Sequence, residues 1–276
     1  MKSVVLGLAV LLSWGTLLGQ NRPLITETPE TVGKNRIRLE LGFEFLQDAV
    51  FTFSGLEGDL SRIGVLGLRL GVASNVELQF FWAAQNFLNV NRRWDAPNTP
   101  NLDFSGNSTS DVGDLVIASK FHFVREKGAR PAIGFQVAAE LPNASNQSGL
   151  GNDEMNFYTS ILLEKKFNKF KVIGNAGFAI LGDPVTPGAQ DDLFTYGLAG
   201  AYSVSETFTL VADFYGRAGQ GGVGTDEHSL VRLGTQINAA GLYWDVAFLA
   251  GLLESDPSTG IIFGLTKDFS VPLFAP

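Results

Sequence analysis

Charged side chains recur in this sequence at even spacings, which place them on one face of an extended segment. Glu40 and Glu44 are such a pair, and two carboxylates on one face could act as a general acid and a general base. Arginines occur at similar positions, and an arginine beside a carboxylate favours an ion pair. We therefore interpret these acids as partners of cations at positions Arg38, Arg69, Arg217 and Arg232.

A glycine-rich stretch at residues 219–224 has the G-x-G-x-x-G spacing of dinucleotide-binding loops. Such a loop holds a pyrophosphate when a helix follows it, because the N-terminus of the helix supplies free N–H groups. The residues after this stretch favour a strand, so we expect a surface loop. The net charge of −8 opposes binding to a polyanionic nucleic acid, and we expect no nucleic-acid partner.

A hydrolase would need a nucleophile beside a base, and the sequence offers two histidines, His122 and His228. Residues 106–110 lack the final glycine of the G-x-S-x-G motif and lie in a polar stretch. We expect no enzyme and no catalytic residue. A lipid-hydrolysing enzyme stays as a lesser hypothesis. Loss of activity on mutating either histidine would support it.

Three acids, Asp183, Asp191 and Asp192, flank one predicted loop and could hold Ca²⁺. Solvated loop acids are the simpler interpretation. The sequence contains no cysteine, which excludes thiolate metal sites and disulfides. We expect no metal and no cofactor.

The stretch at residues 111–123 shows what kind of element positions these charges. It reads DVGDLVIASKFHF, with a turn-forming start followed by strict alternation. Leu115, Ile117 and Phe121 fall on one face, and Lys120 and His122 fall on the other. A period of two indicates a β-strand with two unlike faces.

The same alternation recurs along the whole chain and predicts about twelve strands. Connections after the even-numbered strands are short, and most of those after the odd-numbered strands are longer, with residues 88–112 the longest. Short periplasmic turns and long extracellular loops produce this pattern in outer-membrane barrels. We predict an all-β, antiparallel, up-and-down transmembrane barrel with both ends in the periplasm, and its strands at residues 35–47, 60–72, 76–87, 113–123, 131–140, 155–167, 170–181, 192–203, 208–217, 229–237, 242–253 and 261–269.

The composition agrees with a barrel in a membrane. Charged residues make up 17% of the chain, against roughly 25% in soluble domains, while hydrophobic residues make up 45%. The chain has 32 Gly and 22 Phe but only 2 Met, which favours strands over helices.

The chain begins with features of a secretory signal peptide at residues 1–19: Lys2, an apolar run and small residues before the predicted cleavage site. Residues 20–34 are polar, contain Pro23 and Pro29, and are predicted to form a free periplasmic lead-in. Residues 35–276 form the predicted barrel.

Several stretches resemble a family of outer-membrane barrels named for the meta-pathway of phenol degradation and described as transporters. They are DVGDLVIASKFHF, AAELPNASNQSGLGNDE (138–154), FYTSILLEKKFNKFKVIGNAGFAI (157–180) and IIFGLTKDF (261–269). The resemblance implies passage of small, including hydrophobic, molecules and no catalytic residues. Barrels of this kind often end on an aromatic residue, whereas this chain continues past Phe269, so Phe269 or Phe274 would be the assembly signal.

We expect an outer-membrane channel for passive diffusion of small solutes, with small hydrophobic or aromatic compounds among the candidates. Membrane lipid, the solute and, during insertion, the barrel-assembly machinery are the expected partners. The alternative is a non-conducting structural or adhesive barrel with a plugged lumen. The lumen-lining residues would be Arg38, Glu40, Glu44, Arg69, Glu77, Lys120, Glu140, Asp213, Arg217, Arg232 and Asp245.

Overall fold

A computed structural model describes residues 22–271 of the chain. The predicted signal peptide and Phe274 lie outside the described residues. Among residues 22–271, no helix is both long enough and apolar enough to cross a membrane.

Apart from two short 3-10 helices, Thr99–Asn101 and Asn146–Ser148, the regular secondary structure of the described chain is β-strand, and the predicted number of barrel strands is confirmed. Twelve strands form the wall, and the short β4 is an addition that pairs with β3 beyond the wall. The strands are β1 (Arg36–Phe51), β2 (Leu56–Ala73), β3 (Val76–Arg93), β4 (Ser108–Asp111), β5 (Leu115–Val124), β6 (Ala132–Leu141), β7 (Asn156–Phe167), β8 (Phe170–Gly182), β9 (Gln190–Ser203), β10 (Phe208–Gly219), β11 (His228–Ala239), β12 (Leu242–Gly251) and β13 (Thr259–Ser270).

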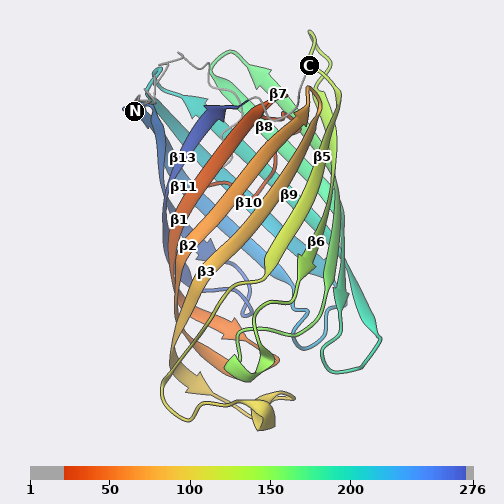
Figure 1. Ribbon diagram of the computed structural model, residues 1–276, viewed down its shortest axis with the longest axis vertical. Helices are drawn as coiled ribbons and strands as arrows, with labels where there is room; N and C mark the ends of the chain where they lie inside the picture. The colour runs from red at the N-terminus through yellow and green to blue at the C-terminus, as the bar shows by residue number, and fades with distance from the viewer. Residues whose placement is uncertain (1–21, 272–276) are drawn as a thin grey trace, which may run out of the picture.

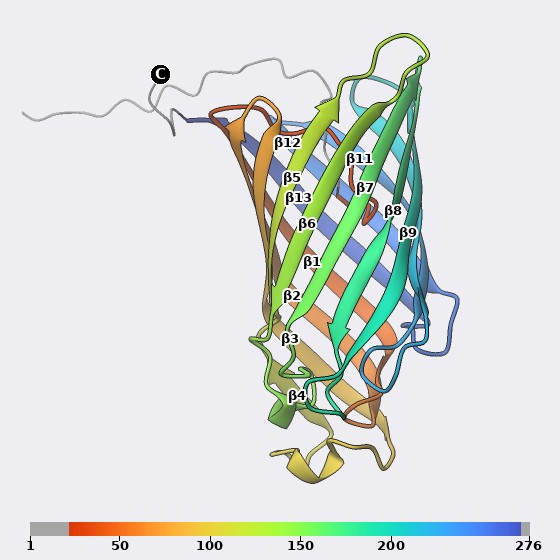
Figure 2. The same ribbon diagram turned by 90° about the vertical axis from the view of Figure 1, so that its right-hand side faces the viewer.

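The sheet closes on itself. Each wall strand pairs antiparallel with its sequence neighbours, with β3 joined to β5, and β1 pairs with both β2 and β13. Arg36 lies opposite Ser270, so the first strand begins where the last one ends. Figures 1 and 2 show the tilted strands running around one elongated barrel. Closure leaves the wall without an unpaired edge, as a membrane-spanning sheet requires.

The two ends of the barrel differ. The end with Arg36 and Ser270, here the turn end, also carries the short connections at residues 74–75, 168–169 and 240–241. The opposite end, here the loop end, carries the longer connections, including residues 94–107 and 142–155. The first predicted long loop, residues 48–59, is wrong, because β1 and β2 extend into it and leave a turn at residues 52–55.

The outer wall is apolar. Large hydrophobic side chains stay exposed along it, among them Phe178 at 60%, Leu198 at 57% and Leu233 at 57%. Exposure of so many such side chains is unfavourable in water, whereas a hydrocarbon layer covers them without cost. The outer face therefore contacts membrane lipid.

A bulge in β2 changes the direction of one predicted outward side chain. Simple alternation places Arg62 on the lipid face, but Gly64 (φ +66°) adds a residue to β2 relative to β1. The shift turns Arg62 toward the interior, where its Nη1 donates to Glu44 Oε2 at 3.0 Å. Glycine adopts this backbone conformation without the Cβ penalty that other residues carry.

Apolar side chains fill part of the barrel interior near the loop end. Leu56, Leu88 and Ile262 are fully buried there, and Leu102 and Phe104 of the connection after β3 pack against them. The same connection is anchored to neighbouring loops through Asn98 Nδ2 to Asn146 O at 2.5 Å and Asp103 N to Gln147 O at 3.0 Å. The longest predicted loop is thus an ordered cover of the loop end.

Candidate functional site

The first described residues lie inside the barrel. Residues 22–34, here the N-terminal segment, were expected to be a free lead-in, and the structure corrects this. Thr26, Glu27 and Thr28 are buried, with at most 6% of their surface exposed. Figure 2 shows this segment, in red, within the part of the barrel nearer the turn end. The segment is therefore a plug across the lumen.

Glu27 ties the plug to the wall through a central ion network of Glu27, Glu40, Arg69, Glu77 and Lys120. Arg69 Nη1 donates to Glu27 Oε2 at 2.9 Å, and its Nε donates to Glu40 Oε1 at 2.9 Å. Lys120 Nζ lies 2.9 Å from Glu27 Oε1 and 3.2 Å from Glu77 Oε1. All five side chains are buried, so each charge depends on its partners for stability.

Further contacts hold the plug on the opposite side of the barrel. Asp213 accepts hydrogen bonds from the backbone N of Ile25 (2.5 Å) and Thr26 (3.1 Å) and from the Thr26 hydroxyl. Asn175 pairs with both backbone groups of Glu27, at 2.6 and 2.8 Å. Strands far apart in the sequence thus share one short segment as their common partner.

The ends of the plug are held as well. Arg22 forms an ion pair with Asp245 at 3.4 Å and donates to Phe263 O at 2.9 Å. Near the turn end, the backbone N of Val32 donates to Glu77 Oε2 at 2.6 Å. The plug therefore spans from the middle of the barrel toward its turn end.

The predicted lumen residues all lie on the inner side of the wall, but in different surroundings. Glu40, Arg69, Glu77 and Lys120 meet in the central ion network, while Asp213, Asp245 and Arg232 contact the plug. Away from the plug are Arg38, paired with Asp268 at 2.7 Å, Glu44, paired with Arg62, and Glu140 and Arg217 nearer the loop end.

The sequence analysis missed the plug residues themselves, Arg22, Thr26, Glu27 and Thr28. A short polar stretch without periodicity carries no sign of burial. The charges of the predicted lumen cations and acids also nearly cancel without the plug, so they do not indicate a missing partner. The inner-face tyrosines Tyr158 and Tyr215 were also missed, since tyrosine suits either face of a barrel wall.

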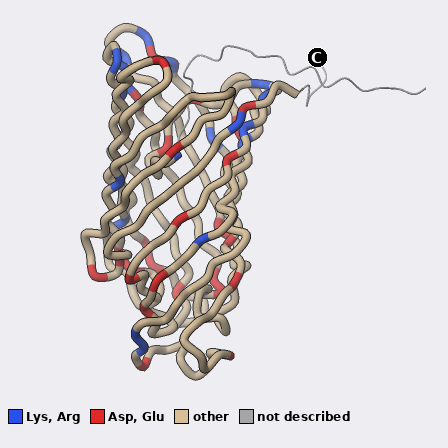
Figure 3. The backbone as a smooth tube through the Cα atoms, turned by 90° about the vertical axis from the view of Figure 1, so that its left-hand side faces the viewer, with Lys and Arg blue, Asp and Glu red and all other residues tan. Residues whose placement is uncertain are grey.

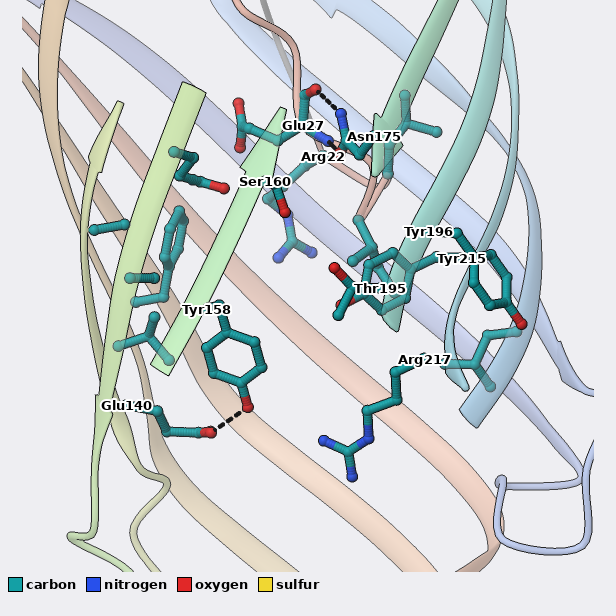
Figure 4. A pocket seen from close by; sticks show the side chains of 18 of the residues that line it. Arg22, Glu27, Glu140, Tyr158, Ser160, Asn175, Thr195, Tyr196, Tyr215 and Arg217 are labelled. Carbon is teal, nitrogen blue, oxygen red and sulfur yellow. Dashed lines mark hydrogen bonds between the residues drawn. The ribbon is translucent and has the colours of Figure 1, made fainter. Parts of the chain in front are cut away.

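Two cavities flank the plug. The loop-side cavity has a volume of about 450 Å³ and is bordered by Arg22, Leu24 and Ile25 of the plug. The turn-side cavity, of about 680 Å³, is bordered by Glu30, Thr31 and Gly33. Figure 4 shows the loop-side cavity, with the plug residues Arg22 and Glu27 above it and Glu140, Tyr158 and Arg217 around its lower part.

The loop-side cavity has unlike walls. Phe81, Val116, Ala118 and Ala138 form an apolar side. Glu140 lies beyond them, and its Oε2 accepts hydrogen bonds from Asn156 Nδ2 at 2.9 Å and from the Tyr158 hydroxyl at 2.7 Å. The cavity therefore offers an apolar surface beside charged and hydroxyl groups, a combination that can orient a small molecule with both kinds of surface.

His228, one of the two candidate bases, has a structural partner. Its Nδ1 donates to Asp256 Oδ1 at 2.8 Å, and Asp256 Oδ2 accepts from the backbone N of Ser229 and Leu253, both at 3.0 Å. Burial raises the pKa of Asp256, but the hydrogen bonds from His228 and the two N–H groups outweigh it and leave the pKa below its usual value. The pair fastens the last long loop to β11.

The remaining sequence motifs also have local structural partners. In the glycine-rich stretch, Gly222 N donates to Asp191 Oδ2 at 3.0 Å, so a carboxylate of the protein itself accepts from this loop. Asp183 Oδ1 accepts from the backbone N of Val185 and Thr186, at 2.8 and 3.2 Å. Within residues 22–271, no three His, Cys, Asp or Glu side chains are grouped in a way that could hold a metal.

The sequence profile of the family described as "Putative MetA-pathway of phenol degradation" matches residues 20–243. The match covers most of the chain, including the plug, ten of the twelve wall strands and the start of β12. The chain belongs to this family. A search of curated proteins finds no match.

Solved outer-membrane barrels share the fold of this family member. An outer membrane channel from Pseudomonas putida F1 matches with a TM-score of 0.64 at 17% identity, over 87% of this chain and 97% of that one. The KdgM porin, solved in complex with disordered oligogalacturonate, matches with a TM-score of 0.52 at 10% identity, over 84% and 99%. With its apolar outer wall, the barrel is a protein of the bacterial outer membrane.

Proposed function

We propose that the barrel is a channel for passive passage of small solutes across the outer membrane, and not an enzyme, and that the plug moves to admit them. One observation carries the proposal: the plug lies between two cavities, each of a size that accepts a small molecule. The eleven predicted lumen residues would then line the route or hold the plug. The turn end, with its short connections, would face the periplasm.

Movement of the plug is supported by the kind of contacts that hold it. They are hydrogen bonds and ion pairs, and only Leu24 joins a cluster of buried apolar side chains. Water can replace these polar contacts, and the buried apolar side chains that would become exposed are Pro23, Leu24 and Pro29. The plug can leave the wall while the barrel stays closed, because the hydrogen bonds between the wall strands do not involve it. The similarity to a solved outer membrane channel agrees with a transport role.

A disulfide that locks the plug tests the proposal, because the chain has no cysteine of its own. A Cβ added at Gly197 would lie 3.3 Å from Thr26 Cβ, close to the separation in disulfides. We expect the refolded Thr26→Cys/Gly197→Cys variant to show low conductance in a planar bilayer when oxidised. A reductant should restore the conductance at least tenfold.

The two single-cysteine variants are the controls, and both should conduct regardless of the reductant. If the oxidised double variant conducts as well as the reduced one, the plug does not need to move. If the wild type, the reduced double variant and the single variants all refold but do not conduct, the channel proposal is wrong.

The alternative, a non-conducting structural or adhesive barrel, is favoured by one observation of its own. The plug and the central ion network fill the lumen with mutually satisfied charges, which would stabilise a closed barrel. Conductance separates the two hypotheses. For either function we expect insertion by the barrel-assembly machinery and no nucleic-acid partner.

A further inference from the structure

Hydrogen-bond donors exceed acceptors in one part of the loop-side cavity. Arg217 donates from Nε to Asp226 O at 2.7 Å, and within residues 22–271 its Nη1 and Nη2 have no partner. Arg232 donates from Nη1 to Pro23 O at 2.9 Å, while its buried Nε has no partner in the described part of the chain. Neither arginine forms an ion pair with a carboxylate of the described chain, although the other interior arginines do.

The nearby acids do not compensate for these free donors. Asp213 lies opposite Arg232 in the strand register, but its oxygens accept the three hydrogen bonds from the plug. Glu140 accepts from Asn156 and Tyr158 through Oε2, and within residues 22–271 no ion pair joins it to Arg217. A partner for Arg217 must therefore bring its own acceptor atoms into the cavity, since a partly buried cation without one carries a desolvation cost.

The position of Arg217 suits an anionic group. Tyr215 and Arg217 are two residues apart on β10, so both side chains face the interior. The Tyr215 hydroxyl has no hydrogen-bond partner in residues 22–271, and both residues border the cavity. Figure 4 shows the guanidinium of Arg217 pointing into the cavity, in the direction of Tyr158 and Glu140.

We propose that the loop-side cavity is a binding site for a small amphipathic carboxylic acid in its anionic form. The carboxylate accepts two hydrogen bonds from the terminal nitrogens of Arg217, in the bidentate geometry that guanidinium groups favour, and one from the Tyr215 hydroxyl. The apolar body of the acid packs against Phe81, Val116, Ala118 and Ala138 on the facing wall. The inference deepens the proposed channel function, because it names the chemical class of the solute.

Equilibrium binding tests the site independently of passage. Benzoate is the probe and benzamide its neutral analogue of the same shape, and each is dialysed against the full mature chain refolded in lipid nanodiscs, with empty nanodiscs subtracted. We expect saturable binding of benzoate at least tenfold tighter than that of benzamide. Arg217→Gln should weaken benzoate binding at least tenfold and leave benzamide binding unchanged.

Arg92→Gln is the matched control, because it removes the same charge from an arginine that is 67% exposed at the loop end. We expect benzoate binding to this variant to equal that of the wild type. Tyr215→Phe, which removes one oxygen atom, should weaken benzoate binding at least threefold. This variant tests the site independently if Arg217→Gln does not refold. Refolding is checked by heat-modifiable migration on a gel.

Absence of saturable benzoate binding to the wild type would overturn the inference. Equal binding of benzoate by the wild type and by folded Arg217→Gln, or by the wild type and Tyr215→Phe, would overturn it as well. Saturable binding without conductance would keep the site and reject the channel, while conductance without binding would do the reverse. The two proposals can therefore fail separately.

Discussion

Gly64 determines which way Arg62 points. Its positive φ permits the bulge that turns the guanidinium from the lipid face to Glu44, and periodicity alone does not reveal such an extra residue. By simple alternation, Lys165 and Lys267 also fall on the lipid face, and both lie near the turn end. Their Nζ atoms donate to Gly128 O and Gly241 O, both at 2.6 Å. A cation near a strand end can therefore stay on the outer face and find a backbone acceptor, whereas Arg62 is turned inward by the bulge.

Gly64→Ala should lower the stability of the barrel. The new Cβ would be held at a positive φ and lie 3.0 Å from Ala84 Cβ, for a cost of about 1–2 kcal/mol. Urea unfolding of the refolded protein measures the loss. Gly106→Ala is the control, because a Cβ there meets nothing within 4 Å, and equal stability of the two variants would contradict the expectation.

The Asp256 carboxylate should stabilise its loop in a pH-dependent way. Its folded-state pKa lies below the usual value, so the folded state binds fewer protons, and the stabilisation is present above about pH 4 and lost as pH falls through the lower folded pKa. We expect Asp256→Asn to unfold at a lower urea concentration than the wild type at pH 7. The difference between the urea concentrations at which the two proteins unfold should become smaller on acidification. A difference that does not depend on pH would argue against stabilisation by the ionised carboxylate.

At the scale of elements, alternation along each wall strand separates lipid from lumen. On β9, Leu193, Thr195 and Ala199 are buried, while Leu198 and Tyr202 are exposed on the outer face. This alternation could be recognised from the sequence because every wall strand has the same two surroundings, hydrocarbon and a polar interior. The loop-end limits of β1, β2 and β3 were harder to predict from the sequence, since apolar side chains there fill the interior as well.

Leu198→Arg should be one of the costliest outward substitutions. Leu198 faces outward opposite Phe214, near the middle of β9 and β10, where an arginine costs about 2–4 kcal/mol. Tyr202→Arg, on the same face but beside the end of β9, should cost about 0–1 kcal/mol. Unfolding of both variants in lipid vesicles gives the comparison, and equal costs would place the hydrocarbon layer elsewhere on the barrel.

At the scale of the whole molecule, charge is distributed unevenly along the barrel axis. Figure 3 shows Lys and Arg gathered at the turn end, while Asp and Glu are more numerous toward the loop end. The central ion network lies between these ends and couples the plug to β1, β2, β3 and β5. Weakening one member should therefore loosen the plug and leave the wall intact.

Glu27→Gln should release the plug. The substitution removes the carboxylate shared by Arg69 and Lys120, and breaking such buried pairs costs about 3–5 kcal/mol. In a Thr26→Cys background, we expect a water-soluble maleimide to label the cysteine at least tenfold faster after Glu27→Gln. Glu30→Gln is the control, because its Lys166 partner is 38% exposed and such pairs contribute little.

Equal labelling rates in these two variants would mean that the central ion network does not hold the plug. Heat-modifiable migration on a gel should show a folded barrel in both, because the hydrogen bonds between wall strands are unaffected. Unfolding of the Glu27→Gln barrel would instead mean that the plug and the wall form one cooperative unit.

The sequence by itself determined the barrel, its strand number, the lipid and lumen faces, and most of the inner charges. These properties are periodic, and a period of two needs only neighbouring residues to be visible. Glu40, Arg69, Glu77 and Lys120 could be placed on the inner side from their own strands alone.

Only the tertiary structure decided that Glu27 joins those four residues and that residues 22–34 plug the lumen. Closure of the sheet brings together Arg69, Lys120, Asn175 and Asp213, which are far apart in the sequence, around a cavity that water or residues 22–34 can fill. A short polar segment has no periodicity that would show whether it or water fills the cavity. The choice depends on the complementarity of charges and hydrogen bonds, which exists only once the barrel has closed.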